Sequence, residues 1–468
     1  MTPSSATPIP ASALALRDAL RAGDLTAREA TQHFLDRIAE GADLGAFLTV
    51  TGEQALAEAA AADERFAATS PTDRATLPAL HGVPLAYKDL TDVAGVPTTH
   101  GSAAIPHPAA AADSPGVAVL RAAGSISLGK TQVPEFGLTG YSENRVGSPA
   151  RNPRDLARTA GGSSGGTAAA VAAGLLPVAP GSDGGGSIRI PALACGLVGL
   201  KPGLGAIPSD VVAGTQDEFG APRLSVTGPI ARSAADAALL FDAMRGARAE
   251  PALAAVARAE ALRGLRVGVT SASPFESAYP APLSPEARAA HELAAEGLAE
   301  LGHVVDAAEV TYDPVYPRAF TIAWTAGLSL MTLPEGAEDK LMPLTRLFRE
   351  RALGRTRQEH VEAAGQLREF AADVRGQWAA YDVVLMPGLT KLPPRIGEFT
   401  SRTPDDDYRL QCEWAPYTSM INVSGLPAIA VPVTTSPEGH AWGVQLVGRS
   451  GSEETLLQLA AQLELALG

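Results

Sequence analysis

The chain has few cysteines and no long apolar run, and each shortage excludes a class of protein. Its 468 residues include only Cys195 and Cys412, too few for a disulfide framework. Neither lies in a CxxC pair, so no zinc site is expected and both are predicted to be buried thiols. The longest apolar stretch, from Ala168 to Leu176, is far shorter than the roughly 20 residues that cross a bilayer.

Targeting signals and basic clusters are also scarce. The N-terminal sequence has no basic start and no small-residue cleavage signal, which is not typical of a secretory peptide. The 37 basic residues are outnumbered by 51 acidic ones, and the net charge of −14 is unsuited to a dedicated nucleic-acid binder. With 46% hydrophobic and 19% charged residues, the chain is not intrinsically disordered. We therefore expect a cytoplasmic protein with no nucleic-acid and no membrane partner.

The segments that are present alternate between helix-like and strand-like patterns, which favours an α/β fold. Thr26 before Glu29 predicts a capping box at a helix start. Strands are expected at residues 81–90, 126–130, 176–180, 265–270, 383–386, 428–433 and 442–447. Helices are expected within residues 11–70, 117–124, 167–173, 232–300, 318–380 and 452–467. We expect loops at 141–163 and, fully solvated, at Asp405–Asp407.

Glycine is plentiful, and many of the 47 glycines fall in two clusters with serine. The first cluster is Gly161–Gly166 and the second is Gly181–Ser187. Flexible linkers at these points would interrupt the apolar α/β sequence around them. Phosphate binding is not favoured either, because neither cluster matches the Walker or G-x-G-x-x-G pattern.

Two catalytic interpretations of the clusters stay open on the residues alone. Ser163 fits the G-x-S-x-G pattern of a nucleophile elbow, and so does Ser164; such an elbow would also need an acid and a later histidine. Four histidines follow it, and nothing distinguishes one of them: His291, His303, His360 and His440. Alternatively, a buried lysine with a lowered pKa could serve as the base, with a third group relaying the proton. The N–H groups of Gly184–Ser187 could then stabilise an oxyanion.

Three separated motifs belong together: Gly82-Val-Pro84 followed by Lys88-Asp89, the loop that contains Ser163, and a Gly-Ser-Asp-x-Gly-Gly-Ser-Ile-Arg loop that contains Ser187, 24 residues further on. Taken together, these motifs resemble the amidase signature family. Flanking segments agree: Lys130–Gly137, Arg151–Pro153, Cys195–Pro202, Thr227–Ile230, Asn422–Pro427 and Gly443–Arg449. The resemblance covers nearly the whole chain.

The resemblance implies a fold and a domain organisation. The implied fold is the α/β amidase signature fold, a large mixed β-sheet between helices in three α/β/α layers. Residues 1–75 would form an N-terminal helical segment packed on the core. Residues 76–468 would form the amidase signature domain, with a helical insertion around 318–380, so that the chain is one structural domain overall.

The resemblance also implies a triad. Ser187 would be the nucleophile, Lys88 the base, and Ser163, after a cis peptide bond, the bridge between them. The oxyanion hole would be the backbone N–H groups of Gly184, Gly185, Gly186 and Ser187. Supporting roles would fall to Ser164, Asp183 and Arg189. No metal and no cofactor is expected.

The implied activity is an amidohydrolase that forms an acyl-enzyme on Ser187 and cleaves carbon–nitrogen bonds of small-molecule amides. Aryl amides, esters and carbamates (urethanes) stay open as substrates, and the chain could be a monomer or a homodimer. The alternative within the family is the glutaminase subunit of a tRNA-dependent amidotransferase. That enzyme usually has Arg-Gln-Pro where this chain has Arg189-Ile-Pro191. A catalytically silent binding protein is a further alternative.

One position departs from the family pattern. Residue 184 often carries Thr or Ile in the family and is glycine here, which suggests the hypothesis that the pocket is enlarged or tolerates bulky acyl groups. Pocket residues are expected from Glu135–Tyr141, Leu193–Ala194, residues 318–350 and Tyr417–Ile421.

The other polar residues near Lys88 are expected to be structural. His81, His100 and His107 have spacings that match no common metal motif. Asp89 could orient Lys88, but a capping or core hydrogen bond is favoured.

Overall fold

The computed structural model describes residues 9–467. Its strands are β1 (Phe47–Val50), β2 (Pro84–Lys88), β3 (Ile126–Thr131), β4 (Arg151–Asn152), β5 (Asp155–Thr159), β6 (Val178–Asp183), β7 (Val198–Lys201), β8 (Val226–Ala231), β9 (Arg266–Val269), β10 (Val304–Ala307), β11 (Val383–Pro387), β12 (Ala428–Thr435) and β13 (Ala441–Gly448). Its α-helices are α1 (Ala13–Ala22), α2 (Ala27–Glu40), α3 (Gly52–Ala68), α4 (Pro115–Ala122), α5 (Gly165–Ala172), α6 (Arg189–Cys195), α7 (Ala234–Met244), α8 (Pro251–Val256), α9 (Pro285–Glu300), α10 (Tyr316–Ala326), α11 (Pro343–Leu353), α12 (Arg357–Trp378), α13 (Pro404–Trp414), α14 (Ser419–Ser424) and α15 (Glu453–Leu467).

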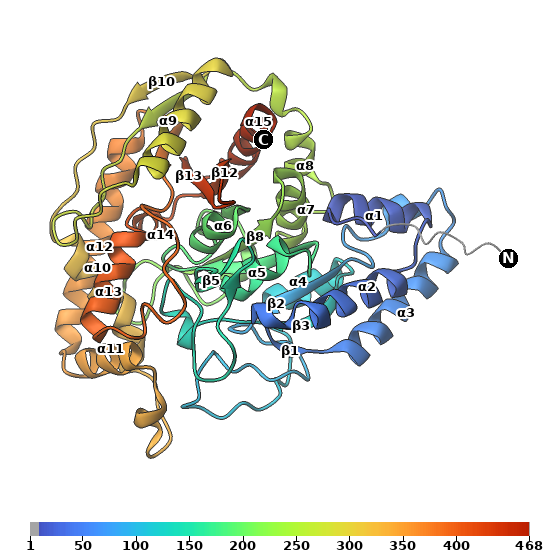
Figure 1. The fold of residues 1–468 in the computed structure, drawn as a ribbon, viewed down its shortest axis with the longest axis horizontal. Coiled ribbons are helices and arrows are strands. Elements are labelled where there is room, and N and C mark those ends of the chain that lie inside the picture. Colours follow the sequence, from blue (N-terminus) through green and yellow to red (C-terminus); the bar gives the residue numbers. More distant parts are fainter. Residues whose placement is uncertain (1–8, 468) are drawn as a thin grey trace.

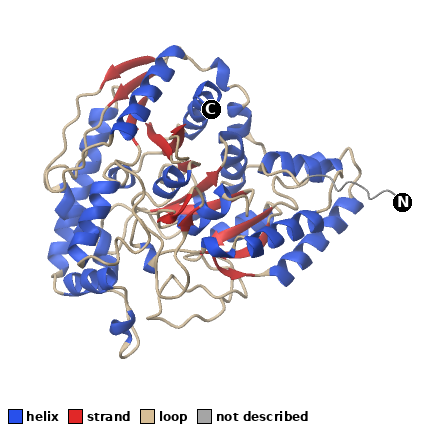
Figure 2. Cartoon of the chain, in the orientation of Figure 1, coloured by secondary structure: helices blue, strands red, loops and turns tan. Residues whose placement is uncertain are grey.

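A large mixed sheet runs through the middle of the molecule, with helices around it (Figures 1 and 2). Its eight strands lie in the order β10-β9-β11-β13-β12-β7-β8-β6. β10, β9 and β11 are parallel, and the other neighbours are antiparallel. A smaller sheet, β1-β3-β2, lies where β2 contacts β6. The end of β2 therefore lies close to the end of β6, which leads into the second glycine cluster.

The side chains of β11 show why the sheet is covered on both faces. Because successive strand residues point to opposite faces, a fully apolar strand needs a helical layer on each side. Val383 and Leu385 belong to the core that includes α9 and α15, whereas Val384 and Met386 pack with α12 and α14. This arrangement confirms the predicted three-layer α/β/α architecture.

The N-terminal segment consists of the helices α1, α2 and α3, with the strand β1 between α2 and α3 in the sequence. Thr26 and Glu29 form the predicted capping box: each side chain accepts from the other residue's backbone N–H. Leu16 and Phe34 belong to the same continuous core as Ile429 of β12. This continuity supports the proposal that residues 1–75 pack on the rest of the chain as part of one domain. Residues 1–8 lie outside the described residues.

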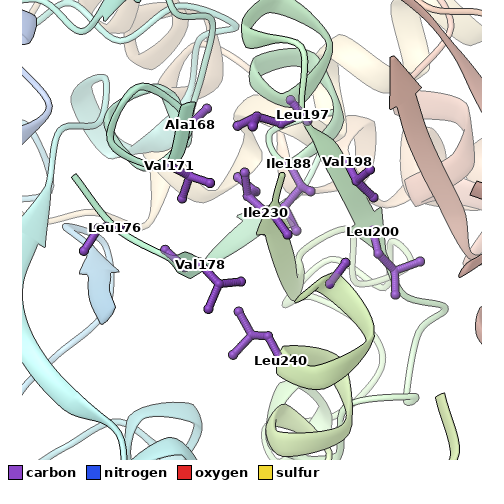
Figure 3. Close-up of a cluster of buried hydrophobic side chains, with 14 of the residues drawn as sticks. Ala168, Val171, Leu176, Val178, Ile188, Leu197, Val198, Leu200, Ile230 and Leu240 are labelled. Atoms are coloured by element: carbon purple, nitrogen blue, oxygen red, sulfur yellow. The ribbon is translucent and has the colours of Figure 1, made fainter. Parts of the chain in front are cut away.

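A dense apolar cluster packs between α5, β8 and the residue that follows Ser187 (Figure 3). Ala168 and Val171 of α5 face Ile188, which directly follows Ser187, and Ile230 of β8 completes the contact. These side chains are fully buried. Both serine loops are thus anchored on packed elements rather than on mobile linkers.

Two expected loops were wrong in part. Residues 141–163 contain the short hairpin β4–β5. Asp405–Asp407 form the first turn of α13, where Thr403 is the N-cap and Pro404 the first helical residue. Three carboxylates suit that position because the N-terminal end of a helix favours negative charge. The acidic run was a helix-start signal and not a solvated loop.

Within residues 9–467, no helix combines the length and the apolar character needed to cross a membrane.

Candidate active site

Lys88, the last residue of β2, is buried and has no carboxylate partner among the described residues. Its Nζ donates hydrogen bonds to Ser163 Oγ at 2.7 Å, Ser182 Oγ at 3.0 Å and the Ser182 carbonyl at 3.1 Å. Burial lowers the pKa of Lys88 to about 7, and the charge of Asp183 opposes this only partly. A substantial neutral fraction near pH 7 gives this lysine the lone pair that a general base requires.

Ser163 lies in the loop that starts α5. The Gly162–Ser163 peptide bond is cis, as expected. Ser163 is 2% exposed, and its Oγ accepts the hydrogen bond from Lys88. A Cβ built on Gly137, which lines the cleft described below, would lie 3.5 Å from Ser163 Oγ. The hydroxyl therefore contacts the buried lysine and lies near Gly137, a residue of the cleft wall.

Ser187 lies in the second glycine loop, between β6 and α6. Its backbone carbonyl accepts a hydrogen bond from the Ser164 N–H at 3.2 Å, which ties the two serine loops together. Ser187 lines the cleft, and among the described residues its hydroxyl makes no hydrogen bond. Ser163 and Ser187 are thus held in adjacent loops, although no hydrogen bond joins their hydroxyls in the described residues.

The second loop is folded around Asp183. Its carboxylate accepts hydrogen bonds from the N–H groups of Gly186 at 2.7 Å and Ile188 at 3.1 Å, and from both Nε and Nη2 of Arg189 at 2.9 Å. Burial alone would raise the pKa of Asp183, but the charge and hydrogen bonds of Arg189, together with Lys201 and Asn422, hold it well below its usual range. Gly186 has a φ of 128°, and a Cβ there would collide with Thr418, so glycine is required.

Arg189 connects this loop to distant strands and helices. Its guanidinium donates to the Thr418 carbonyl at 2.9 Å, to Asn422 Oδ1 at 2.7 Å and to Gln445 Oε1 at 2.5 Å. Asn422 in turn donates to the Asp183 carbonyl at 2.7 Å. The guanidinium is completely buried and fully engaged, which keeps its charge satisfied and the loop in one conformation.

The backbone donors of the loop are not equivalent. The Gly186 N–H, one of the four expected oxyanion-hole donors, already donates to Asp183. Among the described residues, the N–H groups of Gly184, Gly185 and Ser187 donate no hydrogen bond. The expected oxyanion-hole role of the Gly186 N–H therefore conflicts with its hydrogen bond to Asp183. The three other expected donors, including the N–H of Ser187 itself, are free in the described residues.

The cleft beside Ser187 opens to solvent and, with that open part included, has a volume of about 550 Å³. Its lining is Gly137, Leu138, Thr139, Gly140, Gly185, Ser187, Ile190, Phe275, Phe320, Trp324, Tyr408, Gln411, Cys412, Trp414, Ala415 and Ser419. Within the described part of the chain, no Asp, Glu, Lys or Arg lines it. Apolar and aromatic side chains with a few polar groups are typical of sites for uncharged small molecules.

The comparisons with known proteins address the family directly. The family model described as Amidase matches residues 29–457. The chain belongs to the amidase signature family. A Mycobacterium tuberculosis protein named "Putative amidase AmiB2" is 39% identical over 457 residues, covering 95% of this chain and 93% of that protein.

Two solved structures extend the comparison. A 6-aminohexanoate cyclic dimer hydrolase is 31% identical with a TM-score of 0.83, over 97% of this chain and 96% of that one. A bacterial aryl acylamidase of the same family superposes with a TM-score of 0.83 at 24% identity, over 98% of this chain and 97% of that chain, and so shows the shared fold. The chain is an amidase that hydrolyses amide carbon–nitrogen bonds, and no finding supports the amidotransferase alternative.

Part of the cleft of this amidase was expected from sequence. Gly137–Gly140, Phe320, Trp324 and Ser419 lie within the expected segments, whereas Leu193–Ala194 do not line the cleft. The wall made by Tyr408–Ala415 was missed, because its helix α13 begins in the acidic run assigned to a loop. Asn422 and Gln445 were also not singled out, although both lie in the flanking motifs of the amidase resemblance.

The remaining polar residues near Lys88 have structural contacts. Asp89 forms a buried ion pair with Lys130 at 2.9 Å and accepts from the Thr99 N–H at 3.0 Å. His81 and His107 each contact a backbone carbonyl through Nε2. The contacts of Asp89 are those of a core residue, as favoured above.

The Asp183–Arg189 pair makes a clear stability prediction for this amidase. Asp183→Asn leaves the buried guanidinium without its counter-charge, and we expect the free energy of unfolding to fall by about 3–5 kcal/mol. Urea denaturation, with the midpoint and slope compared to the parent protein, measures it. Asp405→Asn is the matched control, because its bidentate pair with Arg351 is largely exposed and should cost less than about 1 kcal/mol. Equal losses in the two variants would contradict the assignment.

Proposed function

We propose that this amidase cleaves neutral small-molecule amides through an acyl-enzyme on Ser187, with Lys88 as base and Ser163 as bridge. One observation carries the proposal. A buried lysine without a carboxylate partner donates a 2.7 Å hydrogen bond to a serine whose loop is tied to that of a cleft-lining serine. A serine hydroxyl is a weak nucleophile until such a base removes its proton.

The first half-reaction follows from these positions. The neutral Lys88 amine accepts the Ser163 hydroxyl proton while Ser163 Oγ accepts the proton of Ser187. The oxygen of Ser187 forms a bond to the substrate carbonyl carbon, and the carbonyl electron pair moves to its oxygen. The free N–H groups of Gly184, Gly185 and Ser187 would stabilise that oxyanion.

The protons are returned when the amine leaves and when the acyl-enzyme is hydrolysed. When the carbon–nitrogen bond breaks, Ser163 gives a proton to the departing nitrogen and recovers one from the Lys88 ammonium. Amides need this protonation because an amide anion is a very poor leaving group. Water then attacks the acyl-enzyme by the same proton route and releases the acid and free Ser187.

The lining of the cleft supports a neutral substrate. Glutamine carries a carboxylate and an ammonium group, and burying either without a partner is costly. Since no charged side chain lines the described cleft, the geometry favours uncharged amides over glutamine. Two unpaired, buried cysteines are compatible with a reducing cytoplasm, which we propose as the location.

A turnover panel tests this function. Purified protein is assayed with an aliphatic amide, an anilide, an amino-acid amide, an activated ester, a carbamate and glutamine, with Ser187→Ala as the blank. We expect hydrolysis of at least one neutral amide that is absent from the blank. Turnover of glutamine alone would support the amidotransferase alternative, and equal rates in protein and blank would contradict the proposal.

A further inference from the structure

An aromatic side chain occupies the space left by the glycine at position 184. A Cβ built on Gly184 would lie 3.1 Å from Cζ3 and 3.3 Å from Cη2 of Trp324. A Cβ on Gly185 would lie 3.8 Å from the same ring. The missing side chain does not simply enlarge the pocket, as hypothesised above, because the indole of α10 lies against the bare backbone of the loop.

The indole is held in place from several sides. Its Nε1 donates to the Leu138 carbonyl at 3.3 Å, across the cleft wall. Phe320, one turn earlier on α10, stacks on it with ring centroids 5.8 Å apart and planes 16° apart. Phe275 meets Phe320 edge-on at 5.9 Å. These contacts fix the ring plane and extend it into an aromatic wall of three side chains.

The wall lies next to the reacting groups. Gly185, Ser187, Phe320 and Trp324 line the same cleft, where an apolar Ile190 is also found. A flat apolar group bound there would bury area against the rings, and an aromatic group would add favourable ring–ring contact beyond that burial. No charged side chain of the described residues lies in the cleft to bind an ionic group instead.

We propose that Trp324 is the specificity-determining residue of this amidase and that it selects substrates with a neutral, aromatic or flat apolar group beside the scissile carbonyl. The glycine at 184 is the partner that makes room for it. This inference rests on the proposed function, since it takes the cleft beside Ser187 as the place of reaction.

The contact between Gly184 and Trp324 predicts that substitutions at these two positions have non-additive effects on substrate discrimination. In Gly184→Thr, the new side chain crowds the indole, so the ring must shift and discrimination should fall. In Gly184→Thr combined with Trp324→Ala, the ring is already absent, so the second change should add little further loss. Residues in direct contact show such non-additivity, whereas independent residues do not.

Two matched substrate series test the proposal. One series varies the acyl group of a p-nitroanilide from acetyl to phenylacetyl, and the other varies the amine of an acetamide from methylamine to benzylamine. In Trp324→Ala and Trp324→Leu we expect kcat/KM for the aromatic member of at least one series to fall about 10-fold to 100-fold. In the series that shows this loss, the small member should change less than about threefold, and Trp324→Phe should retain most of the preference.

The controls separate this inference from the proposed function. Trp442→Phe, at a tryptophan remote from the cleft, should leave the aromatic-to-small ratio unchanged. A fluorophosphonate probe should label Ser187 in every folded variant; failure to label it in the parent protein would contradict the proposed function. If labelling persists and both series show equal loss or no change in Trp324→Ala and Trp324→Leu, the role of Trp324 is overturned.

Discussion

Replacing Ser187 with alanine is expected to lower kcat/KM for amides by about 10⁴-fold or more. The variant keeps the N–H groups of the loop and the aromatic wall, so substrate still binds, but no oxygen is present to form the acyl-enzyme. Residual turnover would then come from the oxyanion donors and from positioning alone. Steady-state rates at saturating and limiting substrate measure both kcat and KM, and we expect the loss in kcat.

The controls for this variant are structural and chemical. Ser401→Ala changes an exposed hydroxyl far along the chain and should leave kcat/KM unchanged. The melting temperature of Ser187→Ala should stay close to that of the parent, because the Ser187 hydroxyl makes no hydrogen bond in the described residues. A Ser187→Ala protein that retains more than about a tenth of the activity would contradict Ser187 as nucleophile.

Replacing Lys88 with methionine is expected to have the second-largest effect, a loss of about 10³-fold to 10⁴-fold on amides. Methionine preserves most of the buried volume but cannot accept the proton that passes through Ser163. Activated esters should lose less, because a phenolate leaves without protonation. Rates for a p-nitrophenyl ester and its matched p-nitroanilide, measured on one variant preparation, give this ratio; equal losses would contradict the proton-transfer role.

The role of Lys88 as base also predicts the direction in which kcat/KM changes with pH. Because the pKa of Lys88 is lowered to about 7, the neutral base is scarce below that pH and abundant above it. The parent kcat/KM should rise with pH through about 7 and then level off, and Lys88→Met should lose this rise.

A second lysine provides the control for this profile. Burial also lowers the pKa of Lys201 to about 7, and its Nζ donates to the Pro202 carbonyl, outside the cleft. Lys201→Met should keep the rise of kcat/KM with pH. If the rise is lost in Lys201→Met, the titrating group is Lys201, and the prediction for Lys88 is contradicted.

Much of the sheet could be predicted from sequence because its central strands are continuous apolar runs. Val383–Met386 and Ala428–Val433 show this pattern, and both form strands. β8 was not predicted, because its Val-Thr-Gly-Pro-Ile-Ala sequence contains the two residues that usually interrupt strands. β10 is short and largely exposed, so its pairing with β9 leaves little apolar pattern to detect.

In the candidate site, too, some residues could be predicted from the sequence and others could not. Lys88 and the two serine loops carry local motifs, so their residues could be named from the sequence. Trp324 could not be assigned to the loop, because its position depends on the packing of α10 over a glycine 140 residues earlier. The α13 wall was missed for a local reason, since three adjacent aspartates were interpreted as a solvated loop rather than as the start of a helix.

Trapping the acyl-enzyme tests the central claim most directly. The parent protein is mixed with an activated ester, quenched in acid within the first turnovers, and examined by intact-mass and peptide-mapping mass spectrometry. The account predicts one acyl adduct, located on Ser187, that is absent from Ser187→Ala. An adduct located on Ser163 or another residue, or turnover by the parent protein with no adduct on Ser187, would contradict it.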